Sequence, residues 1–315
     1  MTRAEWNPRE LSDLTGRTYV VTGATKGLGF FSCDQLARAG AHVILTGRHP
    51  NRLVTARAAL VHRVPDASVE TLLLDTSKLG SVRAAAATLR ARGALDGLLL
   101  NAGVVHPPRA RETVDGNELV LATNVLGHFA LAGELLQPLA AGRGRMVWVG
   151  SISTSLWKYD PVDPQLVTGY TPWRAYVQSK IAATALGFEA DRRLRATGVP
   201  VRSLTAHPGY SMGGRTVGIR GVNEPSRRKR FLANLQAPVT QSKEDGAWSL
   251  VRALTDPEAE GGDFWGPGRM TRGLPRRAKA AAVTRDPAIA ERIWNLCEEA
   301  TGVRWPFAKA ARAAR

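Results

Sequence analysis

The chain has 315 residues, 44% of them hydrophobic and 22% charged, which excludes global disorder and allows one large α/β domain or two small ones. Its two cysteines, Cys33 and Cys297, exclude a disulfide scaffold, and its six histidines show no metal-ligand spacing. No apolar run approaches the roughly 18 residues that span a bilayer, and the N-terminal residues lack the apolar core of a signal peptide. We therefore expect a cytoplasmic protein without a membrane span or a metal site.

The formal net charge of +16 arises from 43 Lys and Arg against 27 Asp and Glu, and it indicates an anionic partner. Nucleic acid, an acidic membrane face and a phosphorylated small molecule all fit this charge. Residues 269–315 contain eleven Lys or Arg and four Asp or Glu. This basic stretch lies outside the motifs described below. We expect no specific nucleic-acid partner, because charge alone binds nucleic acid without sequence preference.

Short apolar runs alternate along the chain with longer stretches rich in Ala, Arg and Leu. Short apolar strands separated by helices indicate a doubly wound parallel sheet covered on both faces, an α/β fold of the dinucleotide-binding type. In chain order we expect a strand over 18–22, a helix over 28–39, a strand over 41–46, a helix over 50–63, a strand over 69–74, a helix over 77–92 capped by Ser77, a strand over 95–100, a helical stretch over 116–140, a strand over 145–149, a helix over 173–197, a strand over 199–205, and helices over 243–254 and 287–300.

Beyond Pro208 the pattern loosens, because five glycines from Gly209 to Gly221 interrupt any long element. A long glycine-rich segment in a compact domain is usually functional or disordered, so we expect a mobile lid over about residues 210–232. The predicted organisation is an N-terminal arm (1–14), one α/β domain (15–260) and a helical C-terminal extension (261–315).

A glycine-rich turn joins the first expected strand to the first expected helix. Gly23 permits a tight turn, Gly27 lets the backbone approach a pyrophosphate, and Gly29 lets the helix pack closely on the strand. The start of the helix offers free N–H groups and a positive dipole to phosphate. The turn is therefore a candidate dinucleotide-binding site.

Further motifs follow in order after the TGxxxGxG spacing of this turn. They are Asp75 after the third strand, Asn101-Ala102-Gly103 after the fourth, Asn124 in the next helix, Ser151 after the fifth strand, Tyr176 and Lys180 in a YxxxK pattern, and Pro208-Gly209 after the sixth strand. From about residue 15 to residue 210, this order and spacing resemble those of the short-chain dehydrogenase/reductase family.

The resemblance implies an oxidoreductase domain that binds a nicotinamide dinucleotide and interconverts a carbonyl and an alcohol. It assigns catalysis to Tyr176 as acid and base, to Ser151 on the reacting oxygen, to Lys180 on the nicotinamide ribose, and to Asn124 in a water-linked proton relay. The implied cofactor-binding residues are Gly23, Thr25, Lys26, Gly27, Leu28, Gly29, Arg48, Asp75, Thr76, Asn101, Ala102, Gly103, Tyr176, Lys180, Pro208 and Gly209.

The chemistry of the Tyr176 and Lys180 pair can be argued directly. Residues four apart share one face of a helix, so the two side chains are neighbours. A phenol with a pKa of about 10 is a poor base at neutral pH, and a neighbouring ammonium lowers that pKa. Tyr176 then exchanges a proton with a carbonyl or carbinol oxygen while the nicotinamide exchanges a hydride.

Two of these assignments have competitors. Ser153 lies two residues after Ser151, which is the better candidate because it directly follows the strand. Tyr170 is a second candidate tyrosine, but Arg174 stands where the motif needs a lysine. An arginine stays charged, so we favour a packing or substrate-loop role for Tyr170.

The loop after the second strand bears on the choice between NAD and NADP. An NAD site usually has a carboxylate there to accept the ribose 2′-hydroxyl, and residues 46–52 contain none. Arg48 and Lys26 fit a 2′-phosphate instead, although both also fit an ordinary basic surface. We expect NADP, with NAD the less favoured cofactor.

The chain departs from the family pattern after Pro208-Gly209. Members commonly have a threonine that contacts the nicotinamide carboxamide, and this chain has Gly213 at that position. Thr216 or Ser211 are candidate substitutes.

An insertion over residues 156–172 and the tail resemble the branch of retinol dehydrogenases, WW-domain oxidoreductases and protochlorophyllide reductases. Members of that branch often act on bulky apolar alcohols or carbonyls, so we expect Trp157, Tyr210 and Met212 beside Ser151 in the substrate pocket. A small-molecule substrate is the expected partner, and a homo-oligomer is compatible with the sequence. The alternative is a catalytically weak, NADP-binding redox sensor of the same fold, which would not need the Tyr176 and Lys180 pair.

Overall fold

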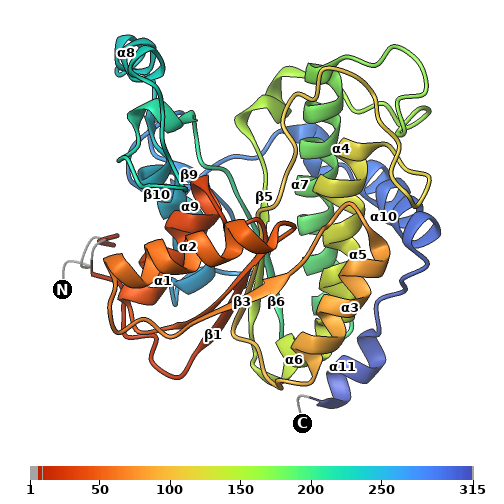
Figure 1. Ribbon diagram of the computed structural model, residues 1–315. Coiled ribbons are helices and arrows are strands. Elements are labelled where there is room, and N and C mark those ends of the chain that lie inside the picture. The colour runs from red at the N-terminus through yellow and green to blue at the C-terminus, as the bar shows by residue number, and fades with distance from the viewer. Residues whose placement is uncertain (1–5, 9, 314–315) are drawn as a thin grey trace, which may run out of the picture.

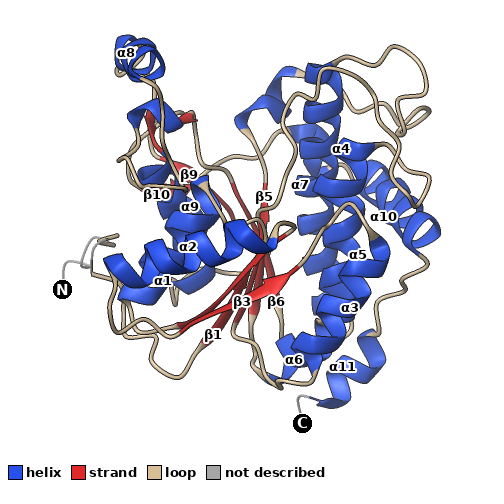
Figure 2. Ribbon diagram, in the orientation of Figure 1, coloured by secondary structure: helices blue, strands red, loops and turns tan. Residues whose placement is uncertain are grey.

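The structure is a computed structural model that describes residues 6–8 and 10–313. One eight-stranded sheet has the order β10-β9-β6-β5-β4-β1-β2-β3, and a separate pair joins β7 to β8. All neighbours in the large sheet are parallel except β9 and β10 (Figure 2). The strands are β1 (Thr18–Val21), β2 (His42–Gly47), β3 (Val69–Leu73), β4 (Gly97–Leu100), β5 (Arg145–Val149), β6 (Arg202–Ala206), β7 (Ser211–Met212), β8 (Gln241–Ser242), β9 (Phe264–Pro267) and β10 (Pro275–Arg277).

Helices cover both faces of this sheet, which confirms the predicted doubly wound α/β fold (Figure 1). The group α1, α2 and α9 packs on one face over a core that includes Phe30 and Leu250. The group α3, α5 and α7 packs on the other over a core that includes Phe129 and Leu186. The helices are α1 (Gly27–Arg38), α2 (Pro50–Arg63), α3 (Leu79–Arg90), α4 (Leu119–Leu121), α5 (Gly127–Glu134), α6 (Leu136–Ala141), α7 (Pro172–Ala196), α8 (Arg227–Leu235), α9 (Lys243–Thr255), α10 (Pro287–Thr301) and α11 (Phe307–Ala313), with the short turns η1 (Ala122–Leu126), η2 (Ile152–Leu156), η3 (Gly213–Arg215) and η4 (Ala282–Arg285).

Two expected helices differ from the structure. The stretch over 116–140 is divided into α4, the π-helical turn η1, α5 and α6. The helix expected over 77–92 begins at Leu79, and Ser77 does not cap it. Instead the Ser77 backbone N–H and hydroxyl donate to Asp75 Oδ1 at 3.1 and 2.7 Å, because a short polar side chain in a turn finds a local partner.

The segment expected as a lid loop, residues 210–232, is partly regular. β7 pairs in parallel with β8, and η3 follows it. Residues 227–232 are the first turns of α8, whose Ser226 side chain accepts a hydrogen bond from the Lys229 N–H. α8 projects from the body of the protein beside the carboxyl ends of the strands (Figure 1).

The C-terminal extension contributes strands as well as helices. The sequence predicts a helical extension here, and Gly and Pro near residue 266 are weak strand formers, whereas β9 pairs with β6 and β10 with β9. Pairing with the existing sheet edge overrides this local preference. Further along, the rings of Trp294 and Phe129 lie 4.9 Å apart, and Trp305 Nε1 donates to Phe129 O at 3.2 Å. These contacts hold α10 and the chain after it against α5.

Within the described ranges 6–8 and 10–313, no helix is both long and apolar enough to cross a bilayer.

Candidate active site

The glycine turn after β1 has the close packing that its spacing predicts. Gly23 has φ +65°, and a Cβ there would lie 2.8 Å from Ala102 Cα. A Cβ at Gly29 would lie 2.6 Å from Asn101 Nδ2 and from Gly23 O. Only residues without a side chain let the turn, α1 and the end of β4 approach this closely.

A cavity of about 440 Å³, here called the glycine-turn cavity, opens at this turn. Most of the expected cofactor residues line it, but Gly29, Tyr176, Lys180, Pro208 and Gly209 do not. Gly29 packs against Asn101 instead, and Gly209 donates its N–H to His207 Nδ1 at 3.2 Å. The expected residues in the lining are Gly23, Thr25, Lys26, Gly27, Leu28, Arg48, Asp75, Thr76, Asn101, Ala102 and Gly103.

The same cavity contains residues that spacing did not single out. His49 follows Arg48 directly and Arg52 lies in the first turn of α2, so their position just after β2 could have indicated them. Nothing in the local sequence connects Lys243 with the glycine turn. Its nearness is set by the fold, since a Cβ at Gly27 would lie 3.9 Å from Lys243 Cδ. The remaining additions are Gly47, Leu74, Val104, Thr123, Val222 and Asn223.

The charges in this cavity suit a phosphate-bearing cofactor. Lys26, Arg52 and Lys243 form no ion pair with any residue in the described part of the chain. Burial, followed by the charge of Lys26, lowers the pKa of Lys243. Asp75 is the one carboxylate in the lining, and its Oδ1 already accepts two bonds from Ser77. Unpaired cations and the N-terminal N–H groups of α1 therefore fit a dinucleotide phosphate.

The π-helical turn η1 connects the glycine-turn cavity to α7. Asn124 Oδ1 accepts from the Val104 N–H at 2.8 Å, and Val104 lines the cavity. Asn124 Nδ2 donates to Ser179 Oγ at 2.9 Å, and Ser179 Oγ donates to Tyr176 O at 2.7 Å. π-helical turns inside α-helices occur frequently at functional sites. This turn places the Asn124 side chain between Val104, which lines the glycine-turn cavity, and Ser179 of α7.

His128, one helical turn after Asn124, supports the arrangement from inside the core. Its Nδ1 lies 3.1 Å from Asn124 O and its Nε2 lies 3.0 Å from Thr22 Oγ1. Burial, with a smaller effect of Lys180, lowers the pKa of His128 to about 3, so the ring is neutral. A carbonyl oxygen only accepts, so Nδ1 carries the proton and Nε2 does not. The Thr22 hydroxyl, which lies against Nε2, is also placed to donate to Leu99 O at 3.1 Å. Thr22 Oγ1 also accepts from the Asn101 and Ala102 N–H groups, at 2.8 and 2.9 Å.

Ser151, at the end of β5, meets Tyr176 from the first turns of α7. The Ser151 side chain lies close enough to the Tyr176 hydroxyl to act on its pKa, and the Tyr176 ring packs edge-on against His106 at 5.2 Å between centroids. Burial raises the pKa of Tyr176, and the bond to Ser151 opposes this effect. The phenol is therefore protonated at neutral pH.

Lys180, one helical turn after Tyr176 in α7, is almost fully buried. Its Nζ donates to Val149 O at 2.7 Å and stands 5.9 Å from the centroid of the Tyr176 ring. Burial lowers the pKa of Lys180 to about 8. The sequence predicts that the ammonium lowers the pKa of Tyr176, but burial dominates in this structure and raises it, because the cation is held by the β5 carbonyl.

The competing residues have other partners. Ser153 Oγ donates to Ser151 Oγ at 2.9 Å, which places it one bond further from Tyr176. Tyr170 Oη donates to Pro107 O at 3.0 Å. Thr216 Oγ1 and Ser211 Oγ donate to Met212 O and Pro208 O, and neither residue lines the glycine-turn cavity.

A second cavity, of about 430 Å³, begins at Ser151 and is here called the Ser151 cavity. None of Trp157, Tyr210 and Met212 lines it, although the sequence predicts them as pocket walls. Trp157 and Tyr210 are 46% and 43% exposed. Spacing along one chain cannot place loop residues in three dimensions, and β9 and the residues after it occupy this wall instead. The lining includes the apolar residues Ile152, Leu156, Phe264, Pro267 and Met270.

Comparisons with known proteins agree with this geometry. A family model described as short chain dehydrogenase matches residues 17–212. Polyprenol dehydrogenase of Mus musculus is 38% identical over 299 residues, covering 93% of this chain and 86% of that protein. Retinol dehydrogenase 13 of Homo sapiens is 30% identical over 300 residues, covering 93% and 87%. A crystal structure of an uncharacterized protein from Mycobacterium paratuberculosis has a TM-score of 0.79 and 32% identity, covering 96% of this chain and all of that one. The chain therefore belongs to the short-chain dehydrogenase/reductase family of oxidoreductases, in its retinol dehydrogenase-like branch.

Proposed function

We propose that the protein interconverts a carbonyl and an alcohol with NADP(H) as hydride carrier, and that Tyr176 exchanges the proton. The observation that carries this proposal is the close approach of Ser151 to the Tyr176 hydroxyl, together with a glycine-turn cavity whose charges suit a dinucleotide. Asn124 connects this cavity to α7, the helix that carries Tyr176, because it is bonded to Val104 in the cavity lining and to Ser179 of α7.

In the reducing direction, Ser151 orients the carbonyl oxygen and the protonated Tyr176 donates its hydroxyl proton to that oxygen. The raised pKa of Tyr176 suits this role, because the group that must donate is protonated at neutral pH. The bound cofactor supplies the hydride to the carbonyl carbon. In the oxidising direction Tyr176 takes the carbinol proton, and Lys180 supplies nearby positive charge when it is protonated below about pH 8.

The preference for NADP over NAD rests on charge in the glycine-turn cavity. Arg48 and Arg52 line the cavity just after β2, where no carboxylate lies. Lys26, at the start of α1, and Lys243, at the start of α9, line the same cavity. A carboxylate there would favour an unmodified ribose, whereas guanidinium groups favour a 2′-phosphate.

The substrate class follows from the Ser151 cavity, which is lined by Leu156, Phe264 and Met270. Two relatives carry names that refer to apolar alcohols, polyprenol and retinol. We infer a long or bulky apolar substrate for this chain, whose reacting oxygen lies at Ser151 and whose apolar part occupies the cavity.

The test is a panel of aldehydes, ketones and alcohols of increasing apolar size, followed by NADPH absorbance, with NADH measured alongside. We expect turnover of apolar members of the panel and faster turnover with NADPH than with NADH. Equal rates with both cofactors would contradict the cofactor preference, and no turnover of any member with either would contradict the enzymatic function.

A further inference from the structure

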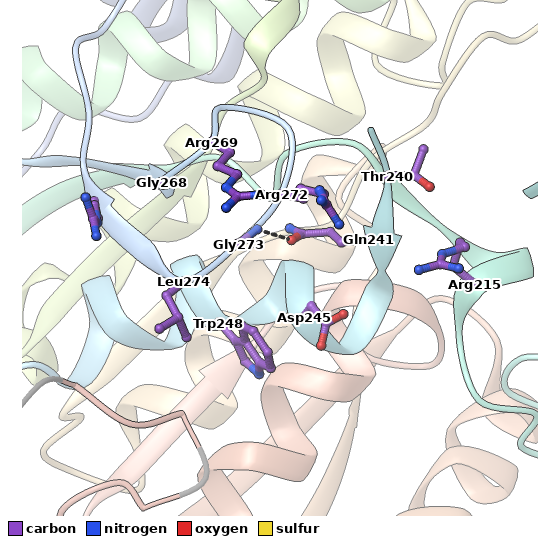
Figure 3. A pocket seen from close by; sticks show the side chains of 11 residues that line it. Arg215, Thr240, Gln241, Asp245, Trp248, Gly268, Arg269, Arg272, Gly273 and Leu274 are labelled. Atoms are coloured by element: carbon purple, nitrogen blue, oxygen red, sulfur yellow. Dashed lines mark hydrogen bonds between the residues drawn. The ribbon is translucent and has the colours of Figure 1, made fainter. Parts of the chain in front are cut away.

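A third cavity, of about 510 Å³, lies between the start of α9 and the loop that joins β9 to β10. Figure 3 shows Arg269 and Arg272 from that loop above Gln241 of β8, with Arg215 of η3 to one side. Arg276 of β10 completes the group, which is here called the arginine cavity. None of these arginines lines the glycine-turn cavity, and of the four only Arg276 also lines the Ser151 cavity.

The charge of the arginine cavity is unbalanced. Arg269, Arg272 and Arg276 form no ion pair with any residue among 6–8 and 10–313. The one carboxylate in the lining, Asp245, accepts the Ser242 N–H as part of the capping box of α9. Guanidinium groups gathered around one cavity repel each other until an anion binds between them.

Arg215 extends the arginine cavity toward α8. Its Nη1 donates to Asn234 Oδ1 at 3.3 Å, which fixes the guanidinium against α8. The guanidinium is therefore held in place beside the cavity before any ligand binds.

The arginine cavity borders the Ser151 cavity. It shares Gly268 and Arg276 with the Ser151 cavity. Gln241 connects the loop between β9 and β10 to the chain that follows β6. Its Oε1 accepts from the Gly273 N–H at 2.9 Å, and its Nε2 donates to Pro208 O at 2.8 Å. The two cavities therefore lie next to each other at Gly268 and Arg276.

We propose that the arginine cavity binds a phosphate group at the far end of an apolar substrate. This rests on the function proposed above for the Ser151 cavity. The apolar part of the molecule fills the Ser151 cavity and its phosphate is held by Arg215, Arg269, Arg272 and Arg276. Arginine binds phosphate oxygens in pairs, so several guanidinium groups around one cavity suit a dianionic phosphate better than a neutral alcohol end.

The test is calorimetric binding to the full chain without added cofactor, at fixed ionic strength, using decyl phosphate below its micelle concentration, decanol and inorganic phosphate. We expect decyl phosphate to bind roughly tenfold or more tightly than either of the other probes, because it alone engages both cavities. Equal affinity for decanol would overturn the phosphate site, and equal affinity for inorganic phosphate would overturn its link to the substrate.

A double substitution, Arg269→Gln with Arg272→Gln, should remove most of the advantage of decyl phosphate over decanol. The matched control is Arg83→Gln with Arg109→Gln, which changes the net charge equally at exposed positions outside both cavities. An equal loss in the control would show that overall charge, and not this cavity, attracts the ligand. Because the readout is binding, a failure of the carbonyl panel with intact decyl phosphate binding would count against the proposed reaction alone.

Discussion

The glycine-turn cavity and the Ser151 cavity are built from different parts of the molecule and offer different surfaces. The first is lined by backbone and polar side chains at the carboxyl ends of β1 to β4, with unpaired cations around it. The second has an apolar part, formed by side chains from η2, β9 and the loop after it, and polar and basic residues around that part. In the function proposed above, the first cavity holds the phosphates of the cofactor and the second holds the apolar part of the substrate. Asn124 contacts the first cavity through Val104 and Tyr176 approaches Ser151 of the second, so these two residues are here called the junction.

The largest effect is expected at that junction. Tyr176→Phe should lower turnover about 10²-fold, equivalent to about 2.7 kcal/mol of barrier, because the proton donor is removed while the ring and its packing remain. The affinity for NADPH, measured by fluorescence titration, should change little. Tyr170→Phe is the matched control, since Tyr170 bonds Pro107 O away from the site. Turnover near the wild-type rate in the Tyr176 variant would show that Tyr176 is not the proton donor.

The same comparison explains how much could be predicted from the sequence. Gly23, Asp75, Asn101 and Ser151 follow strands of a parallel sheet, so their order along the chain places them at one edge. Lys243 could not be predicted, because its approach to Gly27 depends on the packing of α9 against α1.

The Ser151 cavity shows the same limit more strongly. Phe264 reaches it through pairing of β9 with β6, a contact between residues some 60 positions apart. The sequence instead predicted the nearby aromatic Trp157, whose side chain is largely outside the cavity. Local patterns therefore predict the strands and the residues that follow them, whereas the substrate walls depend on long-range pairing.

A smaller effect is expected when the cofactor half alone is changed. Lys243→Met should weaken NADPH binding about tenfold, since a charge-assisted contact to a phosphate contributes on the order of 1.5 kcal/mol. The KM for the carbonyl substrate, at saturating NADPH, should stay within about twofold. Lys309→Met, at an exposed position of α11, is the matched control. Unchanged NADPH affinity in the Lys243 variant would show that Lys243 of α9 does not contribute to cofactor binding.

The smallest effect concerns the histidines that support each half. Burial lowers the pKa of His128 to about 3 and of His207 to about 4, so the unfolded chain binds protons that the folded chain does not once the pH falls below about 6.5. The free energy of unfolding should therefore fall on acidification, by about 1 kcal/mol for each histidine between pH 6.5 and pH 5.5.

Urea unfolding at the two pH values measures this loss. His128→Gln should unfold with a shallower pH dependence than the wild type, and His62→Gln, at an exposed position of α2, should keep the wild-type dependence. If the His128 variant lost as much stability on acidification as the wild type, the buried ring between Thr22 and Asn124 would not be neutral.

The most direct test of the account is to trace the hydride at the junction of the two halves. NADPH carrying deuterium at the reactive position of its nicotinamide is incubated with an apolar carbonyl compound, and the alcohol is analysed by mass spectrometry. The account predicts one deuterium on the carbinol carbon with the wild-type chain and about 10²-fold less labelled alcohol with Tyr176→Phe. Labelled alcohol formed at the same rate by both chains, or no labelled alcohol from the wild type, would contradict it.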